Sequence, residues 1–271
     1  MNARRFFRTP KGLLVVILTL LTALAASAEG YARVAPGLVG AIGIAMVIDA
    51  PLLRWRRGRW HFPSGALLSA LIVAMILSPH EPWYVTTITS AVAVLSKYPL
   101  RARTANVFNP AAFALVATFY PFHTAQSWWG ALPESAPALL IVLFATGGYI
   151  TYKVNKIPVV LSFLGVYFLL ATLNAFAGDA AGVAELFRTP DVNAALFFAF
   201  FMVTDPPTSP PKTRDQLIFG AITGVSAYAA FALIGAAYFL LAGLLVANGW
   251  EAWRRIKAPR GAKLAATSAQ P

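Results

Sequence analysis

Residues 4–28 read RRFFRTPKGLLVVILTLLTALAASA, in which four basic side chains precede an apolar run, 12–28, that carries no charge. Uncharged runs of about 17–25 residues are long enough to cross a bilayer as a helix. Nine more apolar runs follow, so this segment predicts the first helix of a membrane bundle. The small residues 25–28 would also suit the end of a signal peptide. The distribution of positive charge along the chain favours a retained helix.

The composition agrees with a membrane bundle. Of the 271 residues, 58% are hydrophobic and 12% are charged, whereas a soluble domain has about 45–50% and about 25%. A soluble chain of this size could not bury so much apolar surface. There is no cysteine, which excludes disulfides and thiolate metal sites, and three scattered histidines predict no metal site. The net charge of +12 lies in small clusters between apolar runs, which indicates membrane orientation and not a nucleic-acid partner.

Ten apolar runs define the predicted helices, and they are 12–28, 34–53, 62–78, 83–96, 107–122, 136–152, 158–177, 194–203, 217–235 and 236–247. The last two form one stretch that is too long for a single span, so we expect a tight hairpin at Leu233-Ile234-Gly235. With the N-terminus inside, all but Arg33 and Arg188 of the 22 Lys and Arg fall in cytoplasmic segments. We therefore predict an all-α polytopic protein of the bacterial inner (cytoplasmic) membrane, with ten transmembrane helices and both termini cytoplasmic.

A single transmembrane domain, residues 1–256, accounts for this pattern, because no segment is long enough for a separate soluble domain. Residues 257–271 are rich in Ala, Pro, Gly and Lys and are predicted to form a disordered cytoplasmic tail. Two pairs of proline dipeptides at similar spacing indicate a weak internal repeat of two halves, an arrangement that is common in transport folds. Phe62-Pro63 lies 95 residues before Ile157-Pro158, and Asn109-Pro110 lies 96 residues before Asp205-Pro206.

The segment Asn106-Val107-Phe108-Asn109-Pro110-Ala111 opens one of the short runs. Asn109 is a good helix N-cap, and Pro110 suits the first helical position. Such a helix start presents free backbone N–H groups and a positive dipole. One turn could place the amides of Asn106 and Asn109 on one side, where they would match the C=O, N–H, C=O edge of a flavin ring. A capping role alone explains the same residues.

The segment Val203–Pro211 closes another run. Four prolines in six residues form a rigid, non-helical strip, and Asp205 lies where an unpaired carboxylate is costly. An ion pair of Asp205 with Lys212 or Arg214 is the structural alternative to a functional role. Pro63-Ser64-Gly65 is a small-residue helix start that permits close approach of a helix or a ligand.

In order, these segments resemble the membrane subunit family that is shared by the sodium-pumping NADH:quinone reductase (its B subunit) and the Rnf electron transport complex (its D subunit). The matching stretches are Phe62–Gly65, Asn106–Ala111 and Phe201–Pro206, and the similarity spans roughly residues 50–250. Short stand-alone relatives, including a group labelled as enediyne biosynthesis proteins, are similar in length. The resemblance implies a ten-helix architecture related to urea transporters and flavin-borne electron transfer within the membrane.

The resemblance also implies a noncovalent flavin, either riboflavin or FMN, near the cytoplasmic side. Asn106 and Asn109 would hydrogen-bond the ring edge, with Phe108 as an apolar wall and Asp205 close enough to favour a proton or cation. The full set of candidate cofactor-binding residues is Ser64, Gly65, Asn106, Phe108, Asn109, Pro110, Thr204 and Asp205. Larger members attach FMN covalently through the Thr of a Ser-Gly-Ala-Thr segment. Here Ser64-Gly65-Ala66 is followed by Leu67, so no covalent FMN is expected.

The expected function is that of an electron-transfer subunit that exchanges electrons with a quinone or a partner redox protein, with coupling to cation movement. The electron donor must be another protein, because the chain offers no nucleotide-binding domain and no iron–sulfur ligands. A small-solute transporter or channel, or a membrane anchor of a larger complex without a redox cofactor, is the alternative. The visible spectrum of the purified protein separates these hypotheses.

Overall fold

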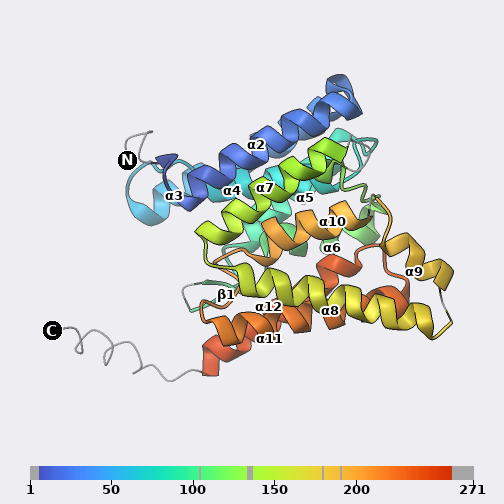
Figure 1. Cartoon of the computed structure of the whole chain (residues 1–271). Helices are drawn as coiled ribbons and strands as arrows, with labels where there is room; N and C mark the ends of the chain where they lie inside the picture. Colours follow the sequence, from blue (N-terminus) through green and yellow to red (C-terminus); the bar gives the residue numbers. More distant parts are fainter. Residues whose placement is uncertain (1–5, 104, 133–136, 179, 190, 258–271) are drawn as a thin grey trace.

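The helices of the chain lie side by side and run back and forth between two ends of the molecule (Figure 1). The computed structural model describes residues 6–103, 105–132, 137–178, 180–189 and 191–257. The helices are α2 (Pro10–Glu29), α3 (Tyr31–Arg57), α4 (Ser64–Ile76), α5 (Trp83–Ser96), α6 (Pro110–Phe122), α7 (Pro137–Lys153), α8 (Ile157–Phe176), α9 (Ala180–Leu186), α10 (Asp191–Phe198), α11 (Thr213–Ala229) and α12 (Phe239–Lys257). The shorter elements are β1 (Arg101–Ala102), β2 (Ala105–Asn106), the 3-10 turn η1 (Trp129–Ala131) and the π-helical turns η2 (Ala199–Val203) and η3 (Ala230–Ile234).

Each predicted apolar run corresponds to a helix, which confirms the all-α polytopic membrane fold. By length and composition, four described helices can cross a membrane, namely Pro10–Glu29, Tyr31–Arg57, Ile157–Phe176 and Thr213–Ile234. Five shorter apolar helices are Ser64–Ile76, Trp83–Ser96, Pro110–Phe122, Leu139–Lys153 and Asp191–Val203, and α12 supplies the remaining run. The expected hairpin is also present. Gly235 ends η3 with a φ of 63°, a left-handed conformation that favours glycine.

Two of the helices begin with the same local signature of a capping side chain followed by proline. The Thr9 hydroxyl accepts a hydrogen bond from the N–H of Gly12 (3.1 Å), and Pro10 is the first residue of α2. The Asn109 side-chain oxygen accepts from the N–H of Ala112 (3.1 Å), and α6 begins at the next residue. The cap satisfies one of the backbone N–H groups that a helix start leaves without a partner.

The shortness of α4 and α6 creates the room for a site. Each has 13 residues, which extend about 20 Å at about 1.5 Å per residue, less than the roughly 30 Å of a bilayer's hydrocarbon core. Non-helical segments continue the chain beyond these helix starts, and they are 58–63 before α4 and, before α6, the described residues 97–103 and 105–109. Irregular backbone at membrane depth is tolerated where protein buries it or where it lines a cavity.

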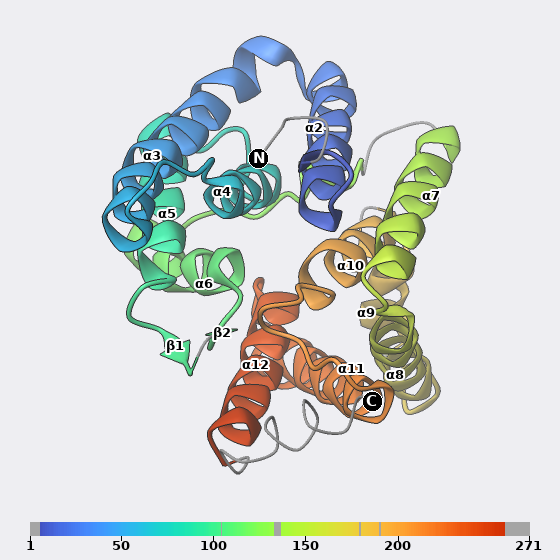
Figure 2. The same ribbon diagram turned by 90° about the vertical axis from the view of Figure 1, so that its left-hand side faces the viewer.

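The two halves of the chain pack in the same helix order. In the first half α3 packs mainly on α5, which contacts α6, and in the second half α8 packs mainly on α11, which contacts α12. The halves meet where α6 lies beside α12 (Figure 2). The proline dipeptides do not mark equivalent places, because Pro63 immediately precedes α4, the third helix of its half, whereas Pro158 lies in α8, the second helix of its half. The helix packing therefore supports an arrangement in two halves more strongly than the spacing of the proline dipeptides does.

Small residues bring α8 and α11 into close contact. A Cβ atom added at Gly220 would lie 2.6 Å from the carbonyl oxygen of Val159, and one added at Gly224 would lie 3.1 Å from that of Phe163. Both distances are too short for an unperturbed side chain. This four-residue spacing of glycines is the small-xxx-small pattern that lets membrane helices approach closely.

The segments that carry the basic clusters lie at one end of the bundle, which we call the basic end (left in Figure 1). It includes the start of α2, the end of α3, the β1–β2 hairpin and the end of α12. This gathering is what the charge pattern predicts, and the assignment of this end to the cytoplasm stays a prediction. Apart from Lys257, the last residue of α12, the predicted tail lies outside the described residues.

Candidate functional site

A cavity of about 1130 Å³ opens at the basic end of the bundle. Its lining comes from the starts of α2, α4 and α6, the end of α3, the segment after α5 and the loop after η2. The volume slightly exceeds the range of about 300–1,000 Å³ that is usual for small-molecule sites. Six of the eight candidate residues line it, and they are Ser64, Gly65, Asn106, Asn109, Pro110 and Asp205.

Phe108 and Thr204 are the two candidates that the fold does not bring to the cavity. The ring of Phe108 stacks on that of Phe113, with 5.9 Å between centroids and 13° between planes. Thr204 is buried, and its hydroxyl donates to the carbonyl of Phe200 at 2.5 Å. The apolar wall that we expected from Phe108 is supplied by other side chains, among them Leu14, Leu68, Ile72 and Phe201.

Asn106 and Asn109 both line the cavity, but different local structures place them there. Asn106 lies in β2 and pairs with Arg101 across an antiparallel hairpin, so the two amides do not share one helical turn. Asn109 is 4% exposed and caps α6 through its side-chain oxygen. Within the described part of the chain, the NH₂ group of Asn109 has no hydrogen-bond partner. This NH₂ group is therefore a donor at the cavity that is available to a ligand.

Asn248 of α12 is a site residue that our sequence reasoning missed. Its side-chain oxygen accepts from the backbone N–H of Asn109 at 2.8 Å, and its NH₂ group donates to the carbonyl of Thr208 at 3.3 Å. The residue is fully buried. It joins the two proline-marked segments, which lie far apart in the sequence. The available signal was a polar amide directly after the last apolar run, since such residues in membrane helices are often functional.

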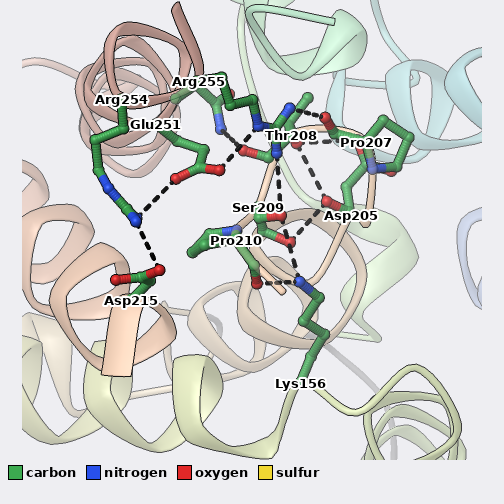
Figure 3. A network of polar contacts seen from close by, with 11 residues as sticks. Lys156, Asp205, Pro207, Thr208, Ser209, Pro210, Asp215, Glu251, Arg254 and Arg255 are labelled. Carbon is green, nitrogen blue, oxygen red and sulfur yellow. Dashed lines mark hydrogen bonds and ion pairs between the residues drawn. The ribbon is translucent and has the colours of Figure 1, made fainter. Parts of the chain in front are cut away.

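The loop after η2 folds back on Asp205 (Figure 3). The carboxylate of Asp205 accepts from the Thr208 hydroxyl at 3.0 Å, and its backbone carbonyl accepts from the N–H groups of Thr208 and Ser209. The alternative ion pair with Lys212 or Arg214 does not form among the described residues. Asp205 is thus held as the first residue of a turn and faces the cavity instead of a surface cation.

Two cations from outside the loop hold its carbonyl groups (Figure 3). The ammonium of Lys156, which precedes α8, donates to the carbonyl of Pro210 at 2.5 Å. The guanidinium of Arg255 on α12 donates to the carbonyls of Pro207 (2.6 Å) and Ser209 (3.2 Å). Proline removes N–H donors and prevents helix formation, so these carbonyls depend on side-chain donors.

Acidic side chains orient the α12 arginines. Glu251 is 4% exposed, and its carboxylate accepts from the Nε–H of Arg255 at 2.8 Å and from Arg254 at 3.1 Å. Arg254 also pairs with Asp215 of α11 at 2.6 Å. Because each partner has several contacts, the end of α12 forms a fixed support for the loop that carries Asp205.

Burial shifts the pKa values of two charged groups at the cavity, Asp205 and Lys97. Burial raises the pKa of the Asp205 carboxyl, although the Thr208 hydrogen bond and the charges of Lys11, Lys97 and Lys156 act in the other direction. Lys97 follows α5 and donates to the carbonyl of Gly65 at 2.7 Å. Burial lowers the pKa of Lys97 to about 8, against the attraction of the acidic groups Asp49 and Asp205. A ligand that brings charge into the cavity would therefore shift the pKa of both the Asp205 carboxyl and the Lys97 ammonium.

Asp49, near the end of α3, also lines the cavity. It is 6% exposed and accepts a hydrogen bond from the hydroxyl of Tyr98 at 2.8 Å. No group of three or more His, Asp or Glu side chains suited to a metal ion occurs within the described residues. The cavity thus combines an apolar wall, a free amide donor and several cations, which suits a flat ligand that carries carbonyl or anionic groups.

Comparisons with known proteins agree with the motif resemblance. A sequence model described as the NQR2, RnfD, RnfE family matches residues 7–139 and 126–248. A protein of Shewanella amazonensis, named as a subunit of an ion-translocating oxidoreductase complex, is 26% identical over 258 residues, covering 69% of this chain and 74% of the relative. The protein of the same name from Tolumonas auensis is 25% identical over 259 residues, with 68% and 74% covered. That of Haemophilus influenzae is 32% identical over 108 residues, which span 38% of this chain and 26% of the relative. With the family model matched over most of its length, the chain belongs to the NQR2, RnfD, RnfE family.

Proposed function

We propose that this chain is a membrane-embedded electron-transfer subunit that holds a noncovalent flavin in the cavity at its basic end. It would pass electrons to or from a quinone or a partner redox protein within a larger complex of the bacterial inner membrane. The observation that carries the proposal is the convergence of Asn106, Asn109, Gly65 and Asp205 on one cavity. The relatives, which are named as subunits of an ion-translocating oxidoreductase complex, support both electron transport and a multi-subunit partner.

The residues at the cavity fit a flavin. When bound, a flavin would supply one- and two-electron transfer. The free NH₂ of Asn109 would donate to a ring carbonyl, the amide of Asn106 would offer both a donor and an acceptor, and Leu68 and Ile72 would contact the apolar part of the ring system. The cavity is large enough for such a ligand with room to spare.

The charged groups would set the electrostatics of the reduced ligand. Negative charge that enters a region of low dielectric is unfavourable unless a cation or proton accompanies it. Lys97 would supply fixed positive charge, and Asp205 would take up a proton or attract a cation. In this way electron uptake would be linked to cation movement, in keeping with the names of the relatives.

A small-solute transporter without a redox cofactor is the second candidate, and the matching helix order of the two halves favours it. In that case the same cavity would be a solute site at the meeting point of the halves. The visible absorption spectrum of the protein, purified in detergent, separates the two functions. We expect the absorption bands of a bound flavin, and a denaturing gel should show no fluorescent flavin band at the mass of the protein. Colourless protein in every preparation would favour the transporter or an anchor.

Replacement of Asn109 locates the flavin. Asn109→Leu removes both the α6 cap and the free NH₂, whereas Asn109→Ser retains a capping oxygen and removes the NH₂ group that would reach the ligand. Loss of one buried hydrogen-bond partner should cost about 1–3 kcal/mol, roughly a tenfold to hundredfold loss of affinity. We therefore expect Asn109→Ser to fold with nearly wild-type stability and to lose flavin on purification. Normal flavin content in this variant would place the cofactor elsewhere.

A further inference from the structure

We propose that the end of α3 is a binding site for the headgroup of an anionic phospholipid. The site is formed by Arg54, Trp55, Arg59 and Trp60, and we call it the α3 headgroup site. It lies on the outside of the bundle, and its ligand is separate from the ligand of the cavity. Three features support it, namely the length of α3, the face on which Arg54 lies, and the absence of a carboxylate partner among the described residues.

The length of α3 carries its last turns into the headgroup layer. The helix has 27 residues, about 40 Å at about 1.5 Å per residue, whereas the hydrocarbon core of a bilayer is about 30 Å thick. Only Gly30 separates the start of α3 from the end of α2, which has 20 residues, so both helices are level at the end opposite the basic end. The seven additional residues of α3, 27 against 20, therefore lie at the basic end.

One outward face of α3 leads directly to Arg54. Pro36, Gly43, Val47 and Arg54 follow one another at spacings of seven, four and seven residues, which keep side chains on one face of a helix. All four residues are exposed, and α3 lies at the periphery of the bundle (Figure 2). Only 17% of its apolar stretch is buried, against 28%, 33% and 44% in the other three long helices. A lipid reaches this face from the side, whereas a soluble acidic protein would approach along the helix axis.

Arg54 is held in place and keeps free donors. Its guanidinium donates to the carbonyl of Gly58, and the guanidinium carbon lies 5.9 Å from the centroid of the Trp60 ring. A guanidinium has five N–H donors in a planar fork that matches phosphate oxygens in pairs. Within the described part of the chain, no Asp or Glu forms an ion pair with Arg54 or Arg59. The remaining donors can therefore bind a phosphate.

The residues around Arg54 supply further positive charge and aromatic rings without any acid. Residues 54–60 read RWRRGRW, and Trp55 is 80% exposed. Trp is enriched at the level of the headgroups, because its ring is apolar and its N–H is polar. Arg56 turns inward over the Tyr98 ring and lines the cavity, as Trp60 also does, but Arg54, Trp55 and Arg59 do not. The α3 headgroup site thus borders the cavity and faces the lipid.

The test measures which phospholipids stay bound to the full-length protein in detergent, by native mass spectrometry with equal amounts of phosphatidylglycerol and phosphatidylcholine. We expect the wild type to retain phosphatidylglycerol preferentially, and this preference to fall as the salt concentration rises, because exposed charges are screened. Arg54→Gln/Arg59→Gln should reduce the preference about 25-fold, since each Arg near an anionic headgroup is worth about fivefold in binding. Arg59→Gln alone leaves the contact of Arg54 with Gly58 intact and should reduce the preference about fivefold.

Lys212→Gln/Arg214→Gln is the matched control, because it removes the same charge at exposed positions of the basic end outside the α3 headgroup site. It should keep the preference for phosphatidylglycerol. Equal retention of the two lipids by the wild type would overturn the proposal, as would an equal loss of preference in the control and in Arg54→Gln/Arg59→Gln. An unchanged lipid preference in Arg54→Gln/Arg59→Gln, together with loss of a cross-linked protein partner, would assign the segment to that partner and overturn the proposal as well.

Discussion

The backbone N–H of Asn109 donates to the side-chain oxygen of Asn248 across a distance of 2.8 Å. The other end of the same amide donates to the carbonyl of Thr208 at 3.3 Å. One side chain of α12 thus fixes the start of α6 relative to the loop that carries Asp205. A buried amide that uses both its donor and its acceptor constrains both partners, because either one would be left unsatisfied if the geometry changed.

Replacing Asn248 should loosen the site. Asn248→Leu leaves the Asn109 N–H and the Thr208 carbonyl without this partner, and we expect it to destabilise the protein by about 1–3 kcal/mol and to reduce flavin retention. Thermal unfolding in detergent and the ratio of flavin to protein measure the two effects. Gly249→Ala is the control, because a Cβ atom there meets no other atom within 4 Å. Wild-type stability and flavin content in Asn248→Leu would show that the link is dispensable.

The charge of Asp205 should make stability depend on pH in a defined direction. Burial raises the pKa of this carboxyl in the folded protein above its ordinary value of 3.8. Its contribution to the free energy of unfolding is therefore fully present below pH 3.8 and is lost as the pH rises through the folded-state pKa. Asp205→Asn should unfold at a higher temperature than the wild type at pH 7, and the difference should shrink in acid. A lower unfolding temperature at pH 7 would mean that nearby lysines stabilise the carboxylate.

Lys97 should raise the reduction potential of a bound flavin. A unit charge at about 8 Å and an effective dielectric constant of about 20 is worth roughly 2 kcal/mol, or about 90 mV for one electron. Lys97→Met should lower the midpoint potential by an amount of this order, and Lys97→Arg should restore part of it. Potentiometric titration followed by absorbance is the measurement. Lys212→Met, at an exposed position of the basic end, is the control and should leave the potential unchanged.

The contact between α8 and α11 should not tolerate a larger residue at Gly220. A side chain at this position would overlap the backbone of α8 near Val159, and overpacking of this kind typically costs about 1–3 kcal/mol. We expect Gly220→Val to unfold at a lower temperature and to give less folded protein in gel filtration. Gly165→Val, on α8 where an added Cβ meets no atom within 4 Å, should behave like the wild type. Equal stability of the two variants would argue against this helix contact.

The orientation of the bundle can be tested directly because the chain has no cysteine. We expect Lys257→Cys at the end of α12 to be labelled only after the cell membrane is permeabilised. Ser127→Cys, an exposed position between α6 and η1, should be labelled in intact spheroplasts. Labelling of both positions from the same side would contradict a topology in which these two segments lie on opposite faces.

Much of the architecture was predictable from the sequence, because the bilayer imposes a simple rule on composition. A run of apolar residues must span the bilayer or be buried within the protein, and Lys and Arg accumulate in the loops on the cytoplasmic side. The ten runs therefore identified the ten apolar helices, and Asn109 marked a helix start through capping chemistry that acts within one turn. The break at Gly235 was predictable for the same local reason.

The sequence did not predict side-chain directions correctly in the non-helical segment before α6. The spacing of Asn106 and Asn109 predicts one helical turn, but Asn106 pairs with Arg101 in an antiparallel hairpin. The family resemblance implies that Phe108 forms an apolar wall of the flavin site, but its ring packs on Phe113 instead. Adjacent residues in irregular backbone point in directions that no sequence period determines.

By itself, then, the sequence determined that the chain is a polytopic helical membrane protein, where its ten apolar helices lie, and which two segments interrupt them. Those properties follow from hydrophobicity, charge and capping, each of which acts over a few residues. Only the tertiary structure decided that Asn248 joins the two segments and that Lys156 and Arg255 hold the loop at Asp205. These contacts connect residues about 40 to 140 positions apart, and they depend on how segments distant in the sequence pack against one another, a relationship that no local pattern encodes.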